Sequence, residues 1–229
     1  MRTHRRGGEP GYKYILLDLD GTLSDSKEGI FNCVRYALER MGYPVPEESV
    51  LTKFIGPPLQ ESYMEFCGMP REEAARGVEL YRERYTPIGQ YENTVAPGMP
   101  ELCRRLKERG YVLAVASSKP EAMCISICER FGMAENMSTI AGGPSEGREW
   151  GKADVIREVF RRLGITEAER HQVLMVGDRK FDVLGAKECG IDCVGVEFFG
   201  YAPPGELADH GAVAVAQTPE QLEEFILTH

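Results

Sequence analysis

The amino-acid sequence predicts an α/β fold, a doubly wound parallel sheet that carries an inserted helical domain. Short, continuous apolar runs alternate with amphipathic helical patterns, as expected of parallel strands buried on both faces. Residues 25–93 interrupt this alternation with helical patterns alone. The chain has 229 residues, which is more than a typical domain of about 100–200 residues needs, so it has room for a core and a smaller insertion.

Six apolar runs are the candidate strands. Four of them are clear, and two are weaker because they are short or interrupted by polar residues. The clear runs are Tyr12–Leu17, Tyr111–Ala116, Val173–Val176 and Cys193–Val196, and the weaker ones are Met137–Ala141 and Ala212–Val215.

Helical patterns separate these runs. Ile156, Val159, Phe160 and Leu163 repeat at helical spacing, and Gly164 follows as a typical helix stop. Two capping-box signatures, Ser118-x-x-Glu121 and Thr218-x-x-Gln221, mark expected helix starts, each with an early proline.

The insertion divides the chain into two expected domains. Residues 1–24 and 94–229 form the core, of which 1–10 are a flexible tail, and residues 25–93 form the helical domain. The exits of the insertion, 24–26 and 93–98, are polar or rich in proline and glycine, so they could act as hinges.

Composition narrows the function classes and the compartment. The net charge of −9 argues against a nucleic-acid polymer as partner, because binding a phosphate backbone needs a basic face. The apolar runs are far too short to span a membrane, and the basic amino terminus lacks the apolar stretch of a signal peptide. Seven scattered cysteines without metal-binding spacing predict reduced thiols and a cytoplasmic protein.

Acidic residues follow the first and third clear strands directly. Side chains alternate along a strand, so Asp18 and Asp20 point to one side, where they repel unless a cation lies between them or one is protonated. Asp178 and Asp182 lie four residues apart after the third clear strand, although Asp182 could equally be a helix cap. Clustered carboxylates at the carboxyl end of a parallel sheet predict a Mg²⁺ site.

Groups suited to an anion lie beside these acids. Ser117 ends the second clear strand, and Ser118 reads as the cap of the helix whose free amides could also bind phosphate. Lys152 opens a helix, where a cation opposes the helix dipole and would be favoured by a bound anion.

In the order and spacing of these acidic residues, Ser117 and Lys152, the chain resembles the haloacid dehalogenase superfamily of phosphohydrolases. Asp18-Leu19-Asp20-Gly21-Thr22 matches the first motif of the family, Ser117 the second, Lys152 the third, and Gly177-Asp178-x-x-x-Asp182 the fourth. The helical insertion resembles the C1 cap of the family, and Phe54–Leu59 resembles the cap loop of its phosphoglycolate-phosphatase-like branch.

The resemblance implies a mechanism for hydrolysing a small phosphorylated metabolite such as phosphoglycolate or a nucleotide 5′-monophosphate. Asp18 attacks phosphorus and forms an aspartyl-phosphate, while Asp20 first protonates the leaving oxygen and then activates water. Asp18, the main-chain carbonyl of Asp20 and Asp178 hold Mg²⁺, with support from Asp182. The expected substrate-binding residues are Thr22, Ser117, Ser118 and Lys152 and, in the cap, Ile55 and Gly56.

Several alternatives stay open. A sugar phosphomutase or a pyrophosphatase of the same superfamily would use the same motifs. A phosphonatase would need a suitably placed cap lysine, and Lys27 and Lys53 lie in no convincing motif. A phospho-acceptor signalling module combines similar residues, but neither the insertion nor the Asp18/Asp20 spacing fits one. A monomer or a weak homodimer is expected, and the glycine-rich segment Ala141–Trp150 has no assigned role.

Overall fold

The computed structural model describes residues 11–144 and 150–229, and the chain divides into two compact units. One unit contains the residues up to Leu23 together with Ala96–His229, and the other is Ser24–Val95, which includes the expected insertion. The expected tail, residues 1–10, and residues 145–149 of the segment Ala141–Trp150 lie outside the described residues.

The first unit contains a six-stranded parallel sheet in the order β5-β4-β1-β6-β7-β8, so the α/β fold class is confirmed. Every apolar run of the sequence forms a strand, including the two weaker ones. The strands are β1 (Tyr14–Leu17), β4 (Val112–Pro120), β5 (Thr139–Gly143), β6 (Val173–Gly177), β7 (Asp192–Val196) and β8 (Ala214–Ala216).

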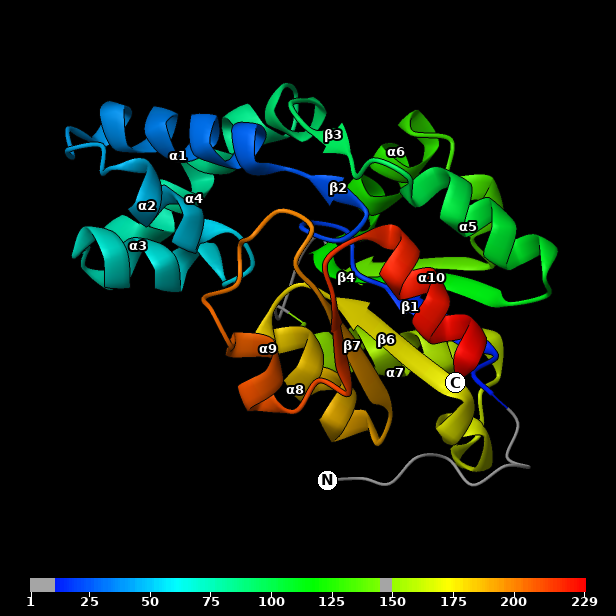
Figure 1. The fold of residues 1–229 in the computed structure, drawn as a ribbon. Helices are drawn as coiled ribbons and strands as arrows, with labels where there is room; N and C mark the ends of the chain where they lie inside the picture. Colours follow the sequence, from blue (N-terminus) through cyan, green and yellow to red (C-terminus); the bar gives the residue numbers. More distant parts are fainter. Residues whose placement is uncertain (1–10, 145–149) are drawn as a thin grey trace. The chain divides into compact units, whose positions relative to one another are not determined.

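Helices cover both faces of this sheet, as in other doubly wound folds (Figure 1). Side chains of α7, α8 and α9 form a core with one face, and α5 and α10 lie over the other. The helices of this unit are α5 (Met99–Glu108), α6 (Glu121–Arg130), α7 (Lys152–Leu163), α8 (Lys180–Cys189), α9 (Glu206–His210) and α10 (Pro219–Thr228), with 3₁₀ turns at Ala134–Asn136 and Glu167–Gln172.

One of the two predicted helix starts is wrong. The Thr218 hydroxyl does cap α10, where it accepts a hydrogen bond from the Gln221 amide at 3.3 Å. Ser118, however, lies within β4, which continues to Pro120 before α6 begins at Glu121. The ring of Pro120 disfavours helical backbone at the residue before it, so Lys119 stays extended and the helix starts later than the capping box predicts.

The second unit is helical, with one short exception. Its helices are α1 (Lys27–Met41), α2 (Glu48–Leu51), α3 (Leu59–Cys67) and α4 (Arg71–Tyr85), with 3₁₀ turns at Thr52–Phe54 and Gly89–Tyr91. Helix α4 packs against α1 and α3, and Phe54 and Tyr63 meet edge to face inside the unit. The exception is an antiparallel pair, β2 (Ser24–Asp25) and β3 (Thr94–Val95), which the sequence did not predict because two residues are too few to show a periodic pattern.

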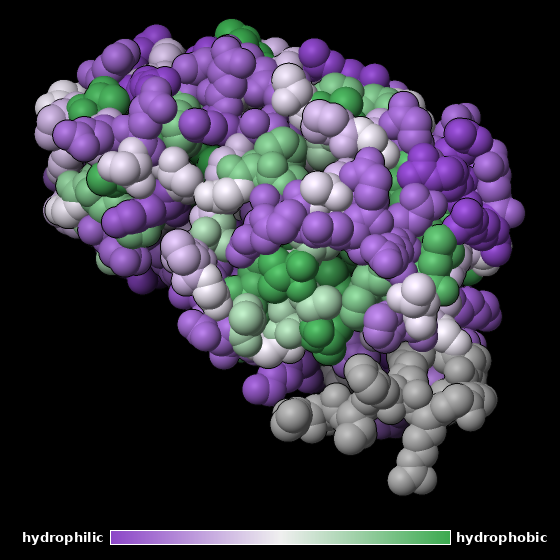
Figure 2. All heavy atoms as spheres, in the orientation of Figure 1, coloured by the Kyte–Doolittle hydropathy of each residue, from purple (hydrophilic) through white to green (hydrophobic). Residues whose placement is uncertain are grey.

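The surface of the first unit is mostly polar, with an apolar area over β7 and β8 (Figure 2). Val213, just before the edge strand β8, is 46% exposed. Among the helices of residues 11–144 and 150–229, none combines the length and the apolar character that a membrane crossing requires. All seven cysteines are free, and all but Cys67 are buried.

Candidate active site

The strand order brings the polar residues of three strand ends together. β1 pairs with β4 on one side and β6 on the other, so that Leu17 lies level with Val115 and Val176. The Asp18 amide extends this register by donating a hydrogen bond to the Val176 carbonyl at 2.9 Å. From β1 the strand order runs to β4 and β5 on one side and to β6, β7 and β8 on the other. Open α/β sheets form their ligand sites at such a switch in strand order.

Three of the predicted carboxylates and one predicted lysine form a buried cluster. The Lys152 ammonium lies 2.7 Å from Asp18 Oδ1 and 2.8 Å from Asp182 Oδ1, and it donates a hydrogen bond to the Ala116 carbonyl at 3.0 Å. One oxygen from each of Asp18, Asp178 and Asp182 lies within 4.8 Å of the other two. Lys152 therefore pairs with two of the three carboxylates, and the cluster holds more acids than this lysine can neutralise.

Asp182 has two roles, and the sequence had left them as alternatives. Its Oδ2 accepts a hydrogen bond from the Arg179 amide at 3.1 Å, which is the capping arrangement at the start of α8. Its Oδ1 belongs to the ion pair with Lys152. Helix capping and membership of the cluster are therefore compatible.

Asp178 has an oxygen that the protein leaves without a hydrogen bond. Its Oδ2 is buried, and within residues 11–144 and 150–229 it has no hydrogen-bond partner. Gly21, at a φ of 80°, keeps the space beside this oxygen open, because a Cβ at that position would lie 2.0 Å from Asp178 Oδ2. A buried carboxylate oxygen is costly when it is unpaired, so this position favours a bound cation.

Burial and mutual repulsion shift the ionisation of this cluster. Burial raises the pKa of Asp18 to about 6, although the charge of Lys152 opposes the rise. Burial and the charges of Asp182 and Asp18 hold the pKa of Asp178 well above its ordinary range. Burial lowers the pKa of Lys152, but the charges of Asp18 and Asp182 outweigh burial and leave that pKa above its ordinary value. The lysine is charged at neutral pH, and a divalent cation would favour the ionised acids.

The Asp20 carboxylate is not one of the three carboxylates grouped around the candidate cation position, and it pairs with a lysine that the sequence did not assign to the site. The Lys119 ammonium lies 2.7 Å from Asp20 Oδ2, with a side chain that is only 8% exposed. The available signal was the position of Lys119, two residues after Ser117, at the end of a buried strand. The signal was missed because a helix start at Ser118 would have turned the chain before Lys119.

The remaining predicted residues differ in their surroundings. Ser117 is 3% exposed, and its hydroxyl lowers the pKa of Asp18 through a hydrogen bond. Thr22 is fully buried, and its Oγ1 has no hydrogen-bond partner. Ser118 is exposed. Contact of these three side chains with a substrate stays a prediction.

The two predicted cap residues belong to the second unit. Ile55 is 1% exposed and follows the buried Phe54, while Gly56 is exposed and has a φ of 104°. A role for either residue in choosing the substrate stays a prediction.

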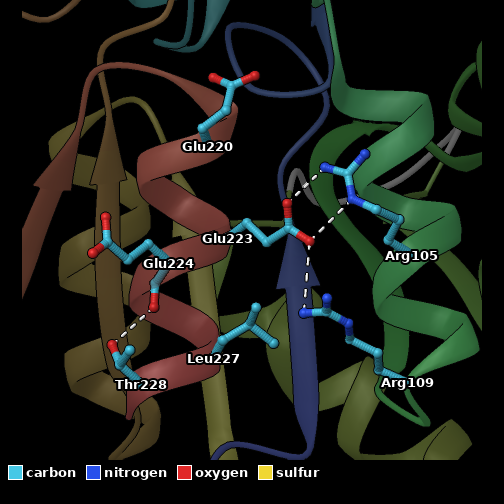
Figure 3. A pocket seen from close by; sticks show the side chains of 7 residues that line it. All are labelled: Arg105, Arg109, Glu220, Glu223, Glu224, Leu227 and Thr228. Carbon is cyan, nitrogen blue, oxygen red and sulfur yellow. Dashed lines mark hydrogen bonds and ion pairs between the residues drawn. The ribbon is translucent and has the colours of Figure 1, made fainter.

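A second charged hollow of the first unit lies between α5 and α10 (Figure 3). Here Glu223 accepts two hydrogen bonds from Arg105, at 3.0 and 2.6 Å, and lies 3.8 Å from Arg109. None of the residues that line it belongs to the acidic cluster, and both of its arginines pair with Glu223. The candidate chemistry therefore lies at the acidic cluster.

Comparisons with known proteins identify the family to which the chain belongs. Residues 15–196 match the family model described as haloacid dehalogenase-like hydrolase. The chain is 40% identical over 218 residues to a protein of Pseudomonas aeruginosa named 5′-nucleotidase, covering 95% of this chain and 97% of the relative. It is 35% identical to the tyrosine-protein kinase PtkA of Mycobacterium tuberculosis, covering 97% of this chain and 76% of the relative.

A plasmid-encoded phosphoglycolate phosphatase of Cupriavidus necator is 29% identical, with 93% of this chain and 92% of the relative covered. A crystal structure of a predicted phosphatase from Clostridium acetobutylicum superposes with a TM-score of 0.88 at 36% identity, covering 96% of this chain and all of that one. The family resemblance seen in the four motifs is thus confirmed. The chain belongs to the haloacid dehalogenase-like hydrolase family, as an enzyme of phosphatase type.

Proposed function

We propose that this enzyme is a Mg²⁺-dependent phosphatase that hydrolyses a small phosphomonoester through an aspartyl-phosphate at Asp18. The observation that carries the proposal is the buried group of Asp18, Asp178 and Asp182, whose oxygens lie within 4.8 Å of one another around one lysine. The family match and the phosphatase-named relatives support the same reaction class.

The residues at the cluster fit a magnesium ion. Mg²⁺ prefers one or two carboxylates together with water and phosphate oxygens, and Asp178 Oδ2 is a buried oxygen to which none of the described residues donates a hydrogen bond. Asp18, Asp178 and the main-chain carbonyl of Asp20 would hold the ion, while Asp182 would support it through Lys152. When bound, Mg²⁺ neutralises the charge that builds up on the phosphoryl oxygens.

The first half of the reaction uses Asp18 and Asp20. A carboxylate oxygen of Asp18 bonds to phosphorus as the bond from phosphorus to the leaving oxygen breaks, and Asp20 gives that oxygen a proton. Lys152 fixes the direction of the Asp18 carboxylate through its 2.7 Å contact, which keeps the nucleophile in line. Ser117 binds a phosphoryl oxygen beside it.

The second half releases phosphate. Asp20, now ionised, takes a proton from a water molecule as the water oxygen bonds to phosphorus and the bond from phosphorus to Asp18 breaks. Asp18 leaves as a carboxylate, and Lys152 stabilises its returning charge. This step separates a phosphatase from a signalling module, which keeps its phosphoryl group.

The proposed substrate is a small phosphorylated metabolite, either a nucleoside 5′-monophosphate or a phosphoglycolate-like acid. The names of the Pseudomonas and Cupriavidus relatives favour these two kinds of substrate, and the helical unit Ser24–Val95 would act as a cap that chooses between them. We also expect a cytoplasmic location, because buried free thiols are typical of reducing compartments.

The test is phosphate release by wild type and Asp18→Asn, with Mg²⁺, over a panel of phosphorylated metabolites. We expect the substitution to lower turnover by at least about 1,000-fold, because it removes the nucleophile. Asp209→Asn is the matched control, since Asp209 is an exposed aspartate on α9. Turnover that survives Asp18→Asn would contradict the proposal, and transfer of the phosphoryl group to a tyrosine without phosphate release would favour the activity named for the mycobacterial relative.

A further inference from the structure

Lys119 is a buried cation next to the site that the reaction described above does not use. Its ammonium makes an ion pair with Asp20 Oδ2 at 2.7 Å, and the exposed fractions of the two side chains are 8% and 20%. Exposed lysines are common, but a lysine this buried requires a charged partner, and here the partner is the expected acid–base residue. The pair is therefore a feature of the site rather than of the surface.

The local backbone explains how Lys119 reaches Asp20. Pro120 keeps Lys119 in extended backbone at the end of β4, past the point where a helix start at Ser118 would have turned it away. β4 lies directly beside β1, so the end of β4 runs next to the loop that carries Asp20. The Lys119 carbonyl also lies 3.5 Å from Cys124 Sγ at the start of α6.

The two oxygens of the Asp20 carboxylate have different surroundings. Oδ2 accepts the hydrogen bond from Lys119, whereas Oδ1 is buried and has no hydrogen-bond partner among the residues that the structure describes. A carboxylate held at one oxygen can rotate little, so its second oxygen keeps a fixed direction. Only that second oxygen is available to exchange a proton with a reacting group.

We propose that Lys119 is a positioning residue that holds Asp20 by Oδ2 and thereby commits Oδ1 to the proton transfers of the reaction. The proposal rests on the proposed function, in which Asp20 acts as acid and then as base. The proton moves from Oδ1 to the leaving oxygen as the bond from that oxygen to phosphorus breaks. Oδ1 then takes a proton from the water whose oxygen bonds to phosphorus as the Asp18 carboxylate departs.

The site thus assigns one lysine to each catalytic aspartate. Lys152 holds the nucleophile Asp18 and shares its charge with Asp182, while Lys119 holds Asp20. Asp18 and Asp20 lie two residues apart on one strand end and would repel one another as ions, so separate cations allow both to stay in the site. Loss of Lys119 should affect proton transfer and leave the in-line attack by Asp18 in place.

Leaving-group dependence separates these two effects. Phenyl phosphate has a basic leaving oxygen and needs a proton donor, whereas dinitrophenyl phosphate has a good leaving group and does not. We expect Lys119→Met to slow single-turnover cleavage of phenyl phosphate by about 10- to 100-fold, a part of the 10²–10⁴-fold that acid–base catalysis contributes. Cleavage of dinitrophenyl phosphate in the same experiment should change by less than about 3-fold.

A double-mutant cycle with Asp20→Asn tests whether Lys119 acts through Asp20. If it does, Lys119→Met should cause no further loss of phenyl phosphate cleavage in the Asp20→Asn background, because the group that it positions is gone. Lys119→Arg, which keeps the charge, should recover part of the rate. Lys187→Met, at an exposed lysine on α8, is the matched control and should behave as wild type.

Three results would overturn the proposal. If Lys119→Met slowed the cleavage of both substrates equally, Lys119 would bind the phosphoryl group. If the rate losses of Lys119→Met and Asp20→Asn were additive in the double variant, Lys119 would act independently of Asp20. A fall in the midpoint of thermal unfolding that accounts for the lost activity, with no recovery in Lys119→Arg, would show a purely structural role. Turnover that persists in Asp18→Asn would instead remove the proposed function, and the assignment of Lys119 with it.

Discussion

The first unit contains two clusters of charged residues, and the two clusters differ in how their charges are satisfied. Between α5 and α10, Glu223 is paired with Arg105 and Arg109 at an open surface (Figure 3). Beyond the carboxyl ends of β1 and β6, one oxygen from each of Asp18, Asp178 and Asp182 lies close to the other two, and Asp178 Oδ2 has no hydrogen-bond partner in the described part of the chain. In the hollow, the two arginines are both paired with Glu223, whereas the acidic cluster has a carboxylate oxygen that none of the described residues pairs with.

The difference shows which charged clusters can do chemistry. Exposed ion pairs stabilise a fold by about 1 kcal/mol or less, because water screens them and the side chains lose freedom. Buried carboxylates that outnumber their cations cost stability, and they persist only where another charge can join them. The excess of buried acid therefore identifies the site better than the size of a hollow does.

Among substitutions that test the difference between the two charged clusters, Asp178→Asn should lower activity the most. It removes a charge from the proposed cation site, so we expect activity at fixed Mg²⁺ to fall by about 100-fold or more. Thermal unfolding gives an independent measurement, because Mg²⁺ should raise the midpoint of the wild type and leave that of the variant unchanged. An equal Mg²⁺ response in both proteins would place the ion elsewhere.

The stability of the metal-free protein should depend on pH through Asp18. The folded-state pKa of about 6 lies above the ordinary value of 3.8, so the protonated side chain favours the folded state at low pH and this contribution is lost as pH rises to 6. In Asp18→Asn, the asparagine side chain does not ionise, so the variant lacks this contribution. Relative to wild type, its free energy of unfolding should therefore increase between about pH 4 and 7, by up to about 3 kcal/mol.

Urea unfolding of the wild type and Asp18→Asn in the presence of a chelator measures this difference. Added Mg²⁺ should reduce the pH dependence of the wild type, because a bound cation favours the ionised carboxylate. A difference between the two proteins that stays constant with pH would show that burial does not shift the ionisation of Asp18.

Glu223→Gln should have the smallest effect. Its partner Arg105 is 36% exposed, so loss of the pair should lower the free energy of unfolding by about 1 kcal/mol or less. Phosphatase activity and the Mg²⁺ response should match those of the wild type. A large loss of activity would mean that the hollow between α5 and α10 takes part in the function.

The sequence predicted the sheet well because buried parallel strands have a distinctive composition. Runs such as Val173–Val176 are apolar at every position, which suits only a strand covered on both faces. The convergence of Asp18 and Asp178 followed from the same pattern, since parallel strand ends meet at one edge of a sheet. Short features such as β2 and β3 were missed because two residues have no periodicity.

Lys119 shows a different limit of sequence reasoning. Its role depends on whether the chain turns at Ser118 or runs on to Pro120, and a capping-box pattern outweighed the effect of the proline in the prediction. The pairing of Lys152 with Asp182 also depends on where α8 begins relative to α7, which packing determines. Local patterns find the residues of a site, whereas their partners depend on tertiary contacts.

The central claim is that Asp18 carries the phosphoryl group during turnover. The most direct measurement is mass spectrometry of the Asp20→Asn variant, quenched with acid after mixing with Mg²⁺ and dinitrophenyl phosphate. This substrate needs no proton donor to form the intermediate, and the variant lacks the base that activates water to remove the intermediate. The account predicts a phosphoryl group on Asp18 in the peptide from Tyr14 to Lys27. No phosphorylated peptide, or phosphorylation of a different residue, would contradict it.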